Sequence, residues 1–180
     1  MGALAAYVRV VEAVCYRVGR VAMWSFFAMM AVLVWSSISK TFLTPALWTL
    51  ETAQFLMVAY FFLGGPYSIQ LGSNVRMDLF YADWSPTKKA QVDALSVFFL
   101  MFFLVVLLWG GVDSLSYSLQ YGERNPTAWR PYLWPIKAAM VFGVILMLLQ
   151  ATAELARDVA KIRGVEFGPR PTERRGEVAS

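Results

Sequence analysis

Long uncharged stretches alternate with short polar segments along this chain of 180 residues. Asp, Glu, Lys and Arg are missing over runs of 19, 24, 19 and 16 residues, at positions 21–39, 52–75, 94–112 and 138–153. A helix rises about 1.5 Å per residue, so about 20 residues cross a hydrocarbon core of ~30 Å. Apolar residues 131–136 lengthen the shortest run, because Lys137 near a helix end can reach the interface. The pattern predicts an all-α integral membrane protein with four transmembrane helices, at about 20–40, 48–72, 89–113 and 132–156.

The first twenty residues have a helical periodicity of their own. At 100° per residue one side is apolar and the other carries the charges; the apolar positions are Leu4, Tyr7, Val8, Val11, Val14, Cys15 and Val18, and the polar ones Arg9, Glu12, Tyr16, Arg17 and Arg20. We expect an amphipathic helix that lies in the headgroup plane, with arginines toward anionic lipid. The alternative is a cytoplasmic extension of the first span. A cleaved signal peptide fits less well, since its apolar run is usually 7–15 residues.

Positive charge orients the spans. Twelve of the 16 Lys and Arg residues lie on the side that holds the N-terminus, the middle loop and the C-terminus. The positive-inside rule therefore places both termini in the cytoplasm of a cell whose inner membrane the chain crosses. Ser85-Pro86 predicts the start of the third helix, with serine as N-cap and proline at the first helical position. We expect one membrane domain over 1–164 and a disordered, charged tail over 165–180.

Composition restricts the chemistry. The chain is 58% hydrophobic and only 16% charged, which favours lipid as its solvent. It has no histidine and a single cysteine, Cys15, which excludes histidine-ligated haem or zinc and any internal disulfide. We therefore expect no cofactor, no metal and no enzymatic activity. Basic residues beside membrane spans explain the net charge of +4 better than nucleic-acid binding does.

Ionisable residues lie at the span ends, whereas an ion-coupled transporter normally needs them deep in the membrane; they are Glu51, Asp93, Asp113, Lys137 and Glu154. Asp113 is the deepest, and we interpret it as an acid of the outer interface that bonds serines or another helix. Within the second span, Gly64-Gly65-Pro66 predicts a kink with tight helix packing. A broken-helix binding site is the other reading, but such segments usually occur in pairs and no second one is present.

Two connections hold candidate contact residues. The middle loop Gly72–Tyr81 mixes charged and apolar residues, so we expect it to dock on something, with Asn74, Arg76 and Asp78 as its polar contacts. The connection between the third and fourth spans, Gln120–Arg130, combines Trp129 with three charges. Tryptophan favours the membrane interface, so Glu123, Arg124 and Arg130 would stay in water and be free to meet a docking protein.

The sequence resembles the small membrane subunit of tripartite ATP-independent periplasmic (TRAP) transporters from the first span to Glu154. The resemblance is carried by Trp48 with Glu51, Phe62-Leu63-Gly64, the segment Gly72–Asp78, Gly122-Glu123, Trp134–Lys137, Phe142-Gly143 and Leu148–Gln150. Where many members have histidine before Val-Arg, this chain has Asn74.

The resemblance implies a system of three parts. A periplasmic binding protein captures an organic acid, typically a carboxylate, and a large permease subunit carries the substrate and sodium sites. The small subunit flanks the permease and supports docking of the binding protein. The residues that we expect at a subunit interface or in a structural role are Trp48, Glu51, Gly64, Gly65, Pro66, Asn74, Arg76 and Asp78.

Two other functions remain open. A stand-alone small exporter could use Glu51 or Asp113 for proton coupling. A membrane-bound enzyme subunit is a weaker reading, because histidine is missing and cysteine nearly so.

Overall fold

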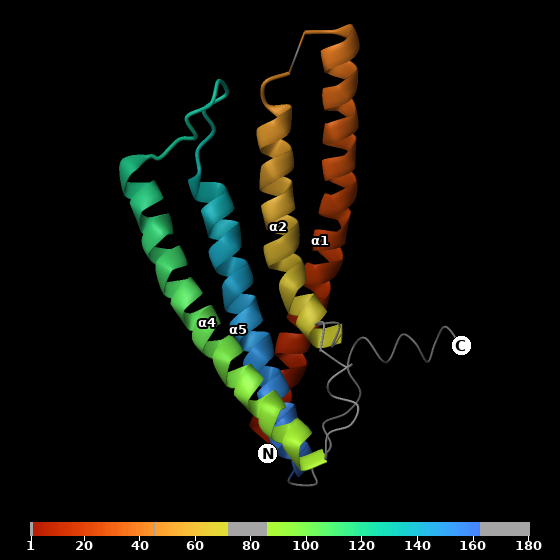
Figure 1. Cartoon of the computed structure of the whole chain (residues 1–180), viewed down its shortest axis with the longest axis vertical. Coiled ribbons are helices and arrows are strands. Elements are labelled where there is room, and N and C mark those ends of the chain that lie inside the picture. Colours follow the sequence, from red (N-terminus) through yellow and green to blue (C-terminus); the bar gives the residue numbers. More distant parts are fainter. Residues whose placement is uncertain (1, 45, 72–85, 163–180) are drawn as a thin grey trace, which may run out of the picture.

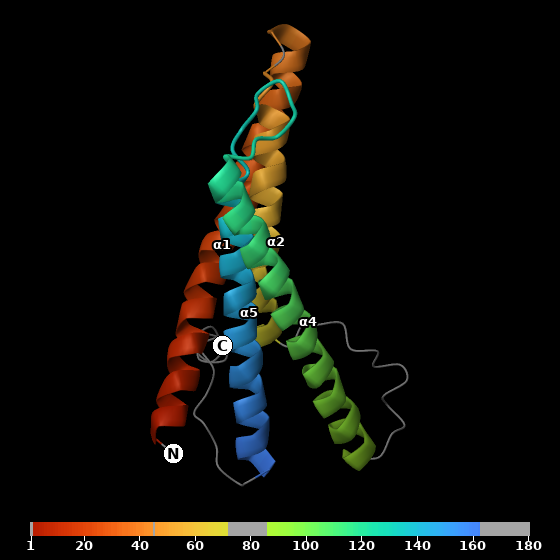
Figure 2. The ribbon, with the colours of Figure 1, turned by 90° about the vertical axis from the view of Figure 1, so that its left-hand side faces the viewer.

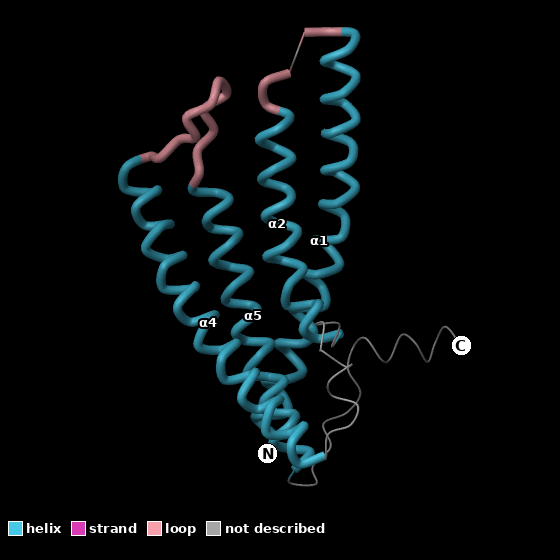
Figure 3. Tube along the Cα trace, viewed as in Figure 1, coloured by secondary structure: helices cyan, strands magenta, loops and turns pink. Residues whose placement is uncertain are grey.

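A computed structural model describes residues 2–44, 46–71 and 86–162. It contains four α-helices: α1 (Gly2–Phe42), α2 (Thr49–Leu71), α4 (Pro86–Tyr121) and α5 (Trp134–Ile162). No β-strand occurs over these ranges, although Arg124 and Tyr132 form an isolated antiparallel bridge in the loop between α4 and α5 (Figure 3). The all-α prediction is confirmed, and α4 begins at the proline that the sequence indicated.

Three helices are long and apolar enough to cross a membrane, within Ala5–Phe42, Ser96–Tyr121 and Trp134–Arg157. The exception is α2. Its 23 residues could cross ~30 Å, but Gln54, Gly64, Gly65 and Pro66 reduce its apolar character. A chain with three apolar helices of this length is a membrane protein, and the fourth span remains a prediction.

The N-terminal segment is not a separate helix in the headgroup plane. It is the first part of α1, which runs for 41 residues, about 60 Å, without a break. We expected lipid to cover the apolar stripe of this segment. Val8, Val11 and Cys15 are instead buried against Leu146 and Ala153 of α5. Packing against another helix therefore extends the first span, as in the alternative interpretation.

Helix α5 holds the molecule together, because it packs against each of the other three helices. In Figure 1 the helices stand side by side in the order α4, α5, α2, α1, and the start of α1 passes close to the end of α5. Figure 2 shows α1 and α4 diverging on opposite sides of α5 at that end. The first residues of α1 and the last of α5 thus share one end of the molecule.

Small residues allow the helices to cross closely. A β-carbon placed on Gly143 of α5 would lie 2.5 Å from the backbone oxygen of Phe62 on α2. One placed on Gly19 of α1 would lie 2.4 Å from the Cβ of Tyr67, also on α2. A β-carbon would not fit at either position without a shift, because α2 lies directly against these two glycines, as small residues permit in membrane helices.

The distribution of side chains is the reverse of that in a water-soluble domain. Among the largest fully buried side chains are Gln70, Gln150 and Glu12, whereas Trp24 and Trp109 are 73% and 79% exposed. Lipid tails favour exposed apolar groups, and polar groups then need partners inside the protein. The described helices therefore have the surface of a membrane protein.

Candidate functional site

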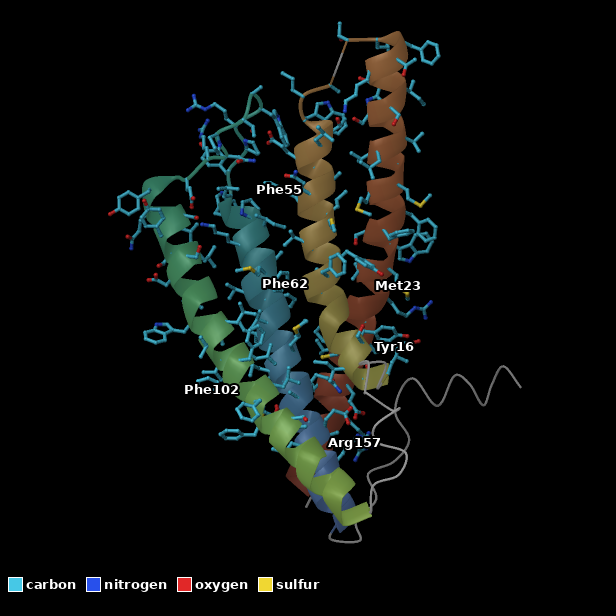
Figure 4. The ribbon with its side chains drawn as sticks, in the orientation of Figure 1. Tyr16, Met23, Phe55, Phe62, Phe102 and Arg157 are labelled. Carbon is cyan, nitrogen blue, oxygen red and sulfur yellow. The ribbon has the colours of Figure 1, made fainter. Side chains whose placement is uncertain are left out.

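A buried ion pair joins the first part of α1 to the end of α5. Arg157 donates two hydrogen bonds to the carboxylate of Glu12, from Nε to Oε1 and from Nη2 to Oε2 at 2.8 Å. The Glu12 side chain is 1% exposed and that of Arg157 9%. Gln70 of α2 donates from Nε2 to the backbone oxygen of Glu12 at 3.4 Å. A planar guanidinium matches a carboxylate in this two-bond geometry. Together with the bond from Gln70, the ion pair joins α1, α2 and α5 at one end of the molecule (Figure 4, where Arg157 is labelled).

Further polar contacts follow the seam between α1 and α5. The hydroxyls of Tyr7 and Thr152 lie 2.8 Å apart. The Cys15 thiol lies 3.9 Å from the backbone oxygen of Leu146, so this cysteine is a buried packing residue. Gln150, fully buried, donates to Glu154 within α5 at 3.3 Å. The seam thus combines these polar contacts with the buried apolar cluster of Val8, Val11 and Cys15.

Sequence reasoning missed this cluster. It placed Glu12 on the charged side of an interfacial helix and counted Arg157 as one of the cytoplasmic charges. A signal was present, since Glu12 is the first acidic residue of the chain and the next is Glu51. A lone acid in a basic segment indicates a specific cationic partner, but the sequence could not tell which of the arginines that partner is.

At the opposite end, buried hydroxyls fasten α1 to α2. Thr49 Oγ1 lies 2.9 Å from Ser36 Oγ and 2.9 Å from the backbone oxygen of Ala46. Ser39 donates to the backbone oxygen of Thr44 at 3.0 Å and accepts from the backbone N–H of Ala46 at 3.2 Å. These bonds replace backbone partners that the chain loses where a helix ends, and they fix the turn into α2.

The interface candidates on α2 divide into internal and exposed residues. Glu51 is only 6% exposed, and its Oε2 has no hydrogen-bond partner among the described residues. Pro66 is buried, and Gly65 faces Met147 of α5, so both serve packing inside the chain. Trp48 is 40% exposed, and nothing lies within 4 Å of a β-carbon placed on Gly64. Trp48 and Gly64 therefore remain open to a partner, while Asn74, Arg76 and Asp78 fall outside the described residues.

The loop between α4 and α5 is organised around Glu123. Its Oε2 accepts a hydrogen bond from Ser118 Oγ at 2.5 Å and one from Lys137 Nζ at 2.6 Å. The hydrogen bond from Lys137, and next that from Ser118, hold the pKa of Glu123 below its ordinary value of 4.5. Lys137 Nζ also lies 3.4 Å from the backbone oxygen of Ser114. Glu123 thus connects the end of α4 with the start of α5, and its charge is neutralised inside the loop.

The two arginines of this loop are placed differently. Arg124 donates from Nη2 to the Tyr132 hydroxyl, and its guanidinium carbon lies 4.1 Å from the centre of that ring. Two backbone hydrogen bonds join the two sides of this loop, from Asn125 N to Pro131 O at 3.0 Å and from Leu133 N to Glu123 O at 3.1 Å. Arg130 is exposed and has a φ of 50°, in the left-handed region. Because Lys137 neutralises Glu123, the remaining charged residues of the loop, Arg124 and Arg130, give it a positive surface.

The polar contacts described above join helices to one another and order the loop between α4 and α5. No group of three or more His, Cys, Asp or Glu side chains in the described part of the chain could hold a metal ion. The charged clusters lie near the helix ends, at Glu12 with Arg157 and at Glu123 with Lys137.

Comparisons with known proteins agree with this picture. Residues 29–161 match the DctQ component of tripartite ATP-independent periplasmic transporters. The chain is also similar to the isethionate TRAP transporter permease protein DctMQ of Oleidesulfovibrio alaskensis, with 30% identity over 117 residues. That alignment covers 63% of this chain and 18% of the relative, so the chain spans less than a fifth of that protein's length. No solved structure matches the chain significantly.

Proposed function

Because the chain belongs to the family of DctQ components of TRAP transporters, we propose that it is the small, non-catalytic membrane subunit of such a transporter in a bacterial inner membrane. In this role it supports a large permease subunit and helps a periplasmic binding protein to dock during sodium-coupled uptake of an organic acid. The observation that carries the proposal is the family match over most of the chain.

The distribution of polar groups supports a non-catalytic role. A carrier that couples transport to ions needs polar side chains near the middle of the membrane. Glu12 is neutralised by Arg157 near one end of the helices, and Glu51 lies in the first turn of α2. The apolar cluster at Leu104, Val144 and Ala151 occupies the centre of α4 and α5. The substrate and sodium sites are accordingly assigned to the permease subunit.

The relative supports a large partner. Its name, DctMQ, is that of a permease protein, and the segment similar to this chain is only 18% of it. We propose that a separate permease subunit supplies the corresponding remainder here. The substrate we propose is a carboxylate, while the relative is named for isethionate, an organic sulfonate. Both are organic anions, so the test includes a compound of each class.

The loop between α4 and α5 supports docking at the periplasmic face. Its Glu123–Lys137 and Arg124–Tyr132 contacts hold it in one conformation, and preorganised surfaces cost less to bind. Arg124 and Arg130 give it positive charge, which would attract an acidic patch on the binding protein. Rim charges of this kind act mainly on the association rate and its salt dependence.

Purification and reconstitution test the proposal. We expect the chain to purify with the permease subunit when the two are co-expressed. Vesicles with both subunits should take up a dicarboxylate or isethionate when the binding protein and an inward sodium gradient are present. Vesicles with the chain alone should take up neither. Proton-driven export by the chain alone would favour a stand-alone exporter, and uptake by the permease without this chain would remove its proposed supporting role.

A further inference from the structure

The outer side of α4 carries exposed aromatic and polar residues. Among the described helices, α4 packs mainly on α5 (Figure 1). From Ser96 on, where the structure describes its side chains, the opposite side of α4 is exposed and includes the aromatic residues Phe98, Phe102 and Trp109, which are 65%, 63% and 79% exposed. In Figure 4 the Phe102 side chain points away from α5. Exposed aromatic residues alone are compatible with lipid, so the polar residues on the same side decide what covers it.

Asp113 lies on this outer side, within the apolar part of α4. It is exposed, and it falls inside the apolar span Ser96–Tyr121, about two helical turns before the end of α4.

The Asp113 carboxylate has no hydrogen bond or ion pair with any residue that the structure describes. The nearby serine does not supply one, because Ser116 donates to the backbone oxygen of Asp113 at 2.8 Å rather than to its side chain. Lys137, the closest cation along this end of α5, is bound to Glu123. An unpaired acid that faces hydrocarbon is costly, and such residues normally face another protein segment.

We propose that the outer side of α4 around Asp113 is a docking surface for a transmembrane helix of the permease subunit, and that this helix presents a Lys or Arg side chain at the depth of Asp113. The inference rests on the proposed function, which supplies the permease. Gly110, one turn before Asp113, has nothing within 4 Å of a β-carbon placed on it, so a second backbone could approach closely there. Exposed Ser116 and Gln120 continue the polar row toward the end of α4. Lipid tails could not satisfy this row, and anionic headgroups would repel the carboxylate.

Photocrosslinking locates the surface in the assembled complex. A photoreactive phenylalanine analogue replaces Trp109 on α4 in one variant and Trp24 on α1 in the matched control, since both tryptophans are more than 70% exposed. We expect crosslinks to the permease from position 109 and few from position 24. Crosslinks to the permease from position 24 alone, or only crosslinked copies of this chain from position 109, would overturn the inference. Because the permease must co-purify before irradiation, failure of the proposed function would be recognised separately.

Charge substitution tests the role of Asp113. Single interhelical polar contacts in membranes change association about three- to twentyfold, so D113N should lower the yield of complex within that range. D113K should lower it further, and D113E should restore most of it. The amount and the circular dichroism of the small subunit show that each variant is folded. If D113N and D113K assemble with the permease as the unchanged chain does, no cation meets Asp113 and the inference is wrong.

Discussion

The ion pair between Glu12 and Arg157 gives the sharpest test of the fold. Substitution of Arg157 by Met keeps much of the side-chain volume but removes the guanidinium that donates twice to Glu12. Glu12 is 1% exposed, so water cannot replace the lost donors without opening the seam between α1 and α5. The bond from Gln70 would survive, because it ends on the backbone of Glu12 rather than on its carboxylate.

The expected loss of stability follows from that burial. Removing one partner of a buried ion pair typically costs about 3–5 kcal/mol, because it leaves a charge without compensation. We expect R157M to lower the free energy of unfolding by this amount. The double variant E12L/R157M removes both charges, and replacements of this kind are often neutral or stabilising. The two single changes should therefore be strongly non-additive.

Reversible unfolding in mixed detergent micelles, followed by circular dichroism, measures these differences. R17Q is the matched control, because Arg17 is an exposed arginine on α1, the helix that carries Glu12, and surface changes usually stay within about 0.5 kcal/mol. If R157M costs no more than R17Q, the carboxylate is solvated or paired elsewhere. If E12L/R157M is as unstable as R157M, the loss comes from packing rather than from an uncompensated charge.

Three further predictions concern packing, protonation and docking. G143A should destabilise the chain by about 1–3 kcal/mol, since its β-carbon would meet the backbone oxygen of Phe62; G64A, with open space, should be neutral or stabilising in the same unfolding assay. Because the pKa of Glu123 is lowered from 4.5, its contribution to loop stability should be present above pH 4.5 and lost as pH falls through that lower pKa. Hydrogen exchange at the amides of Asn125 and Leu133 should follow this loss, and E123Q should abolish the pH dependence. R130E should raise the half-saturating concentration of binding protein at low salt more than at moderate salt, while K40E, an exposed change on α1, serves as the control; equal half-saturation for R130E and the unchanged chain would contradict docking at this loop.

Periodicity and charge were sufficient to predict an all-α membrane protein, because lipid imposes long apolar runs on any helix that crosses it. The start of α4 at Pro86 could also be read locally. The continuity of α1 could not be read from the local sequence. An apolar stripe looks the same whether lipid or another helix covers it, so only the contact of Val8, Val11 and Cys15 with α5 distinguished the two interpretations.

The candidate site was predictable to a smaller extent for a related reason. Sequence spacing identified the residues of the loop at 120–130 but not their pairing, which depends on Ser118, Lys137 and Tyr132 being brought together by two helices. As a result Glu123, which we expected to be available for docking, has a structural role in the loop. The docking role stays a prediction, and Arg130 is now its best candidate.

The position of α5 explains why polar contacts lie at both ends of this helix. Helix α5 packs closely through small and apolar residues along its middle part, as Val144 does against α4 and Gly143 against α2. The orientation of α5 relative to its neighbours is then set by polar contacts at its two ends, where Arg157 binds Glu12 of α1 and Lys137 binds Glu123 in the loop after α4. Because α5 is the main neighbour of α4 among the described helices, we propose that the exposed outer side of α4 receives a partner, and the exposed Asp113 on that side would make charge a means of choosing which partner binds.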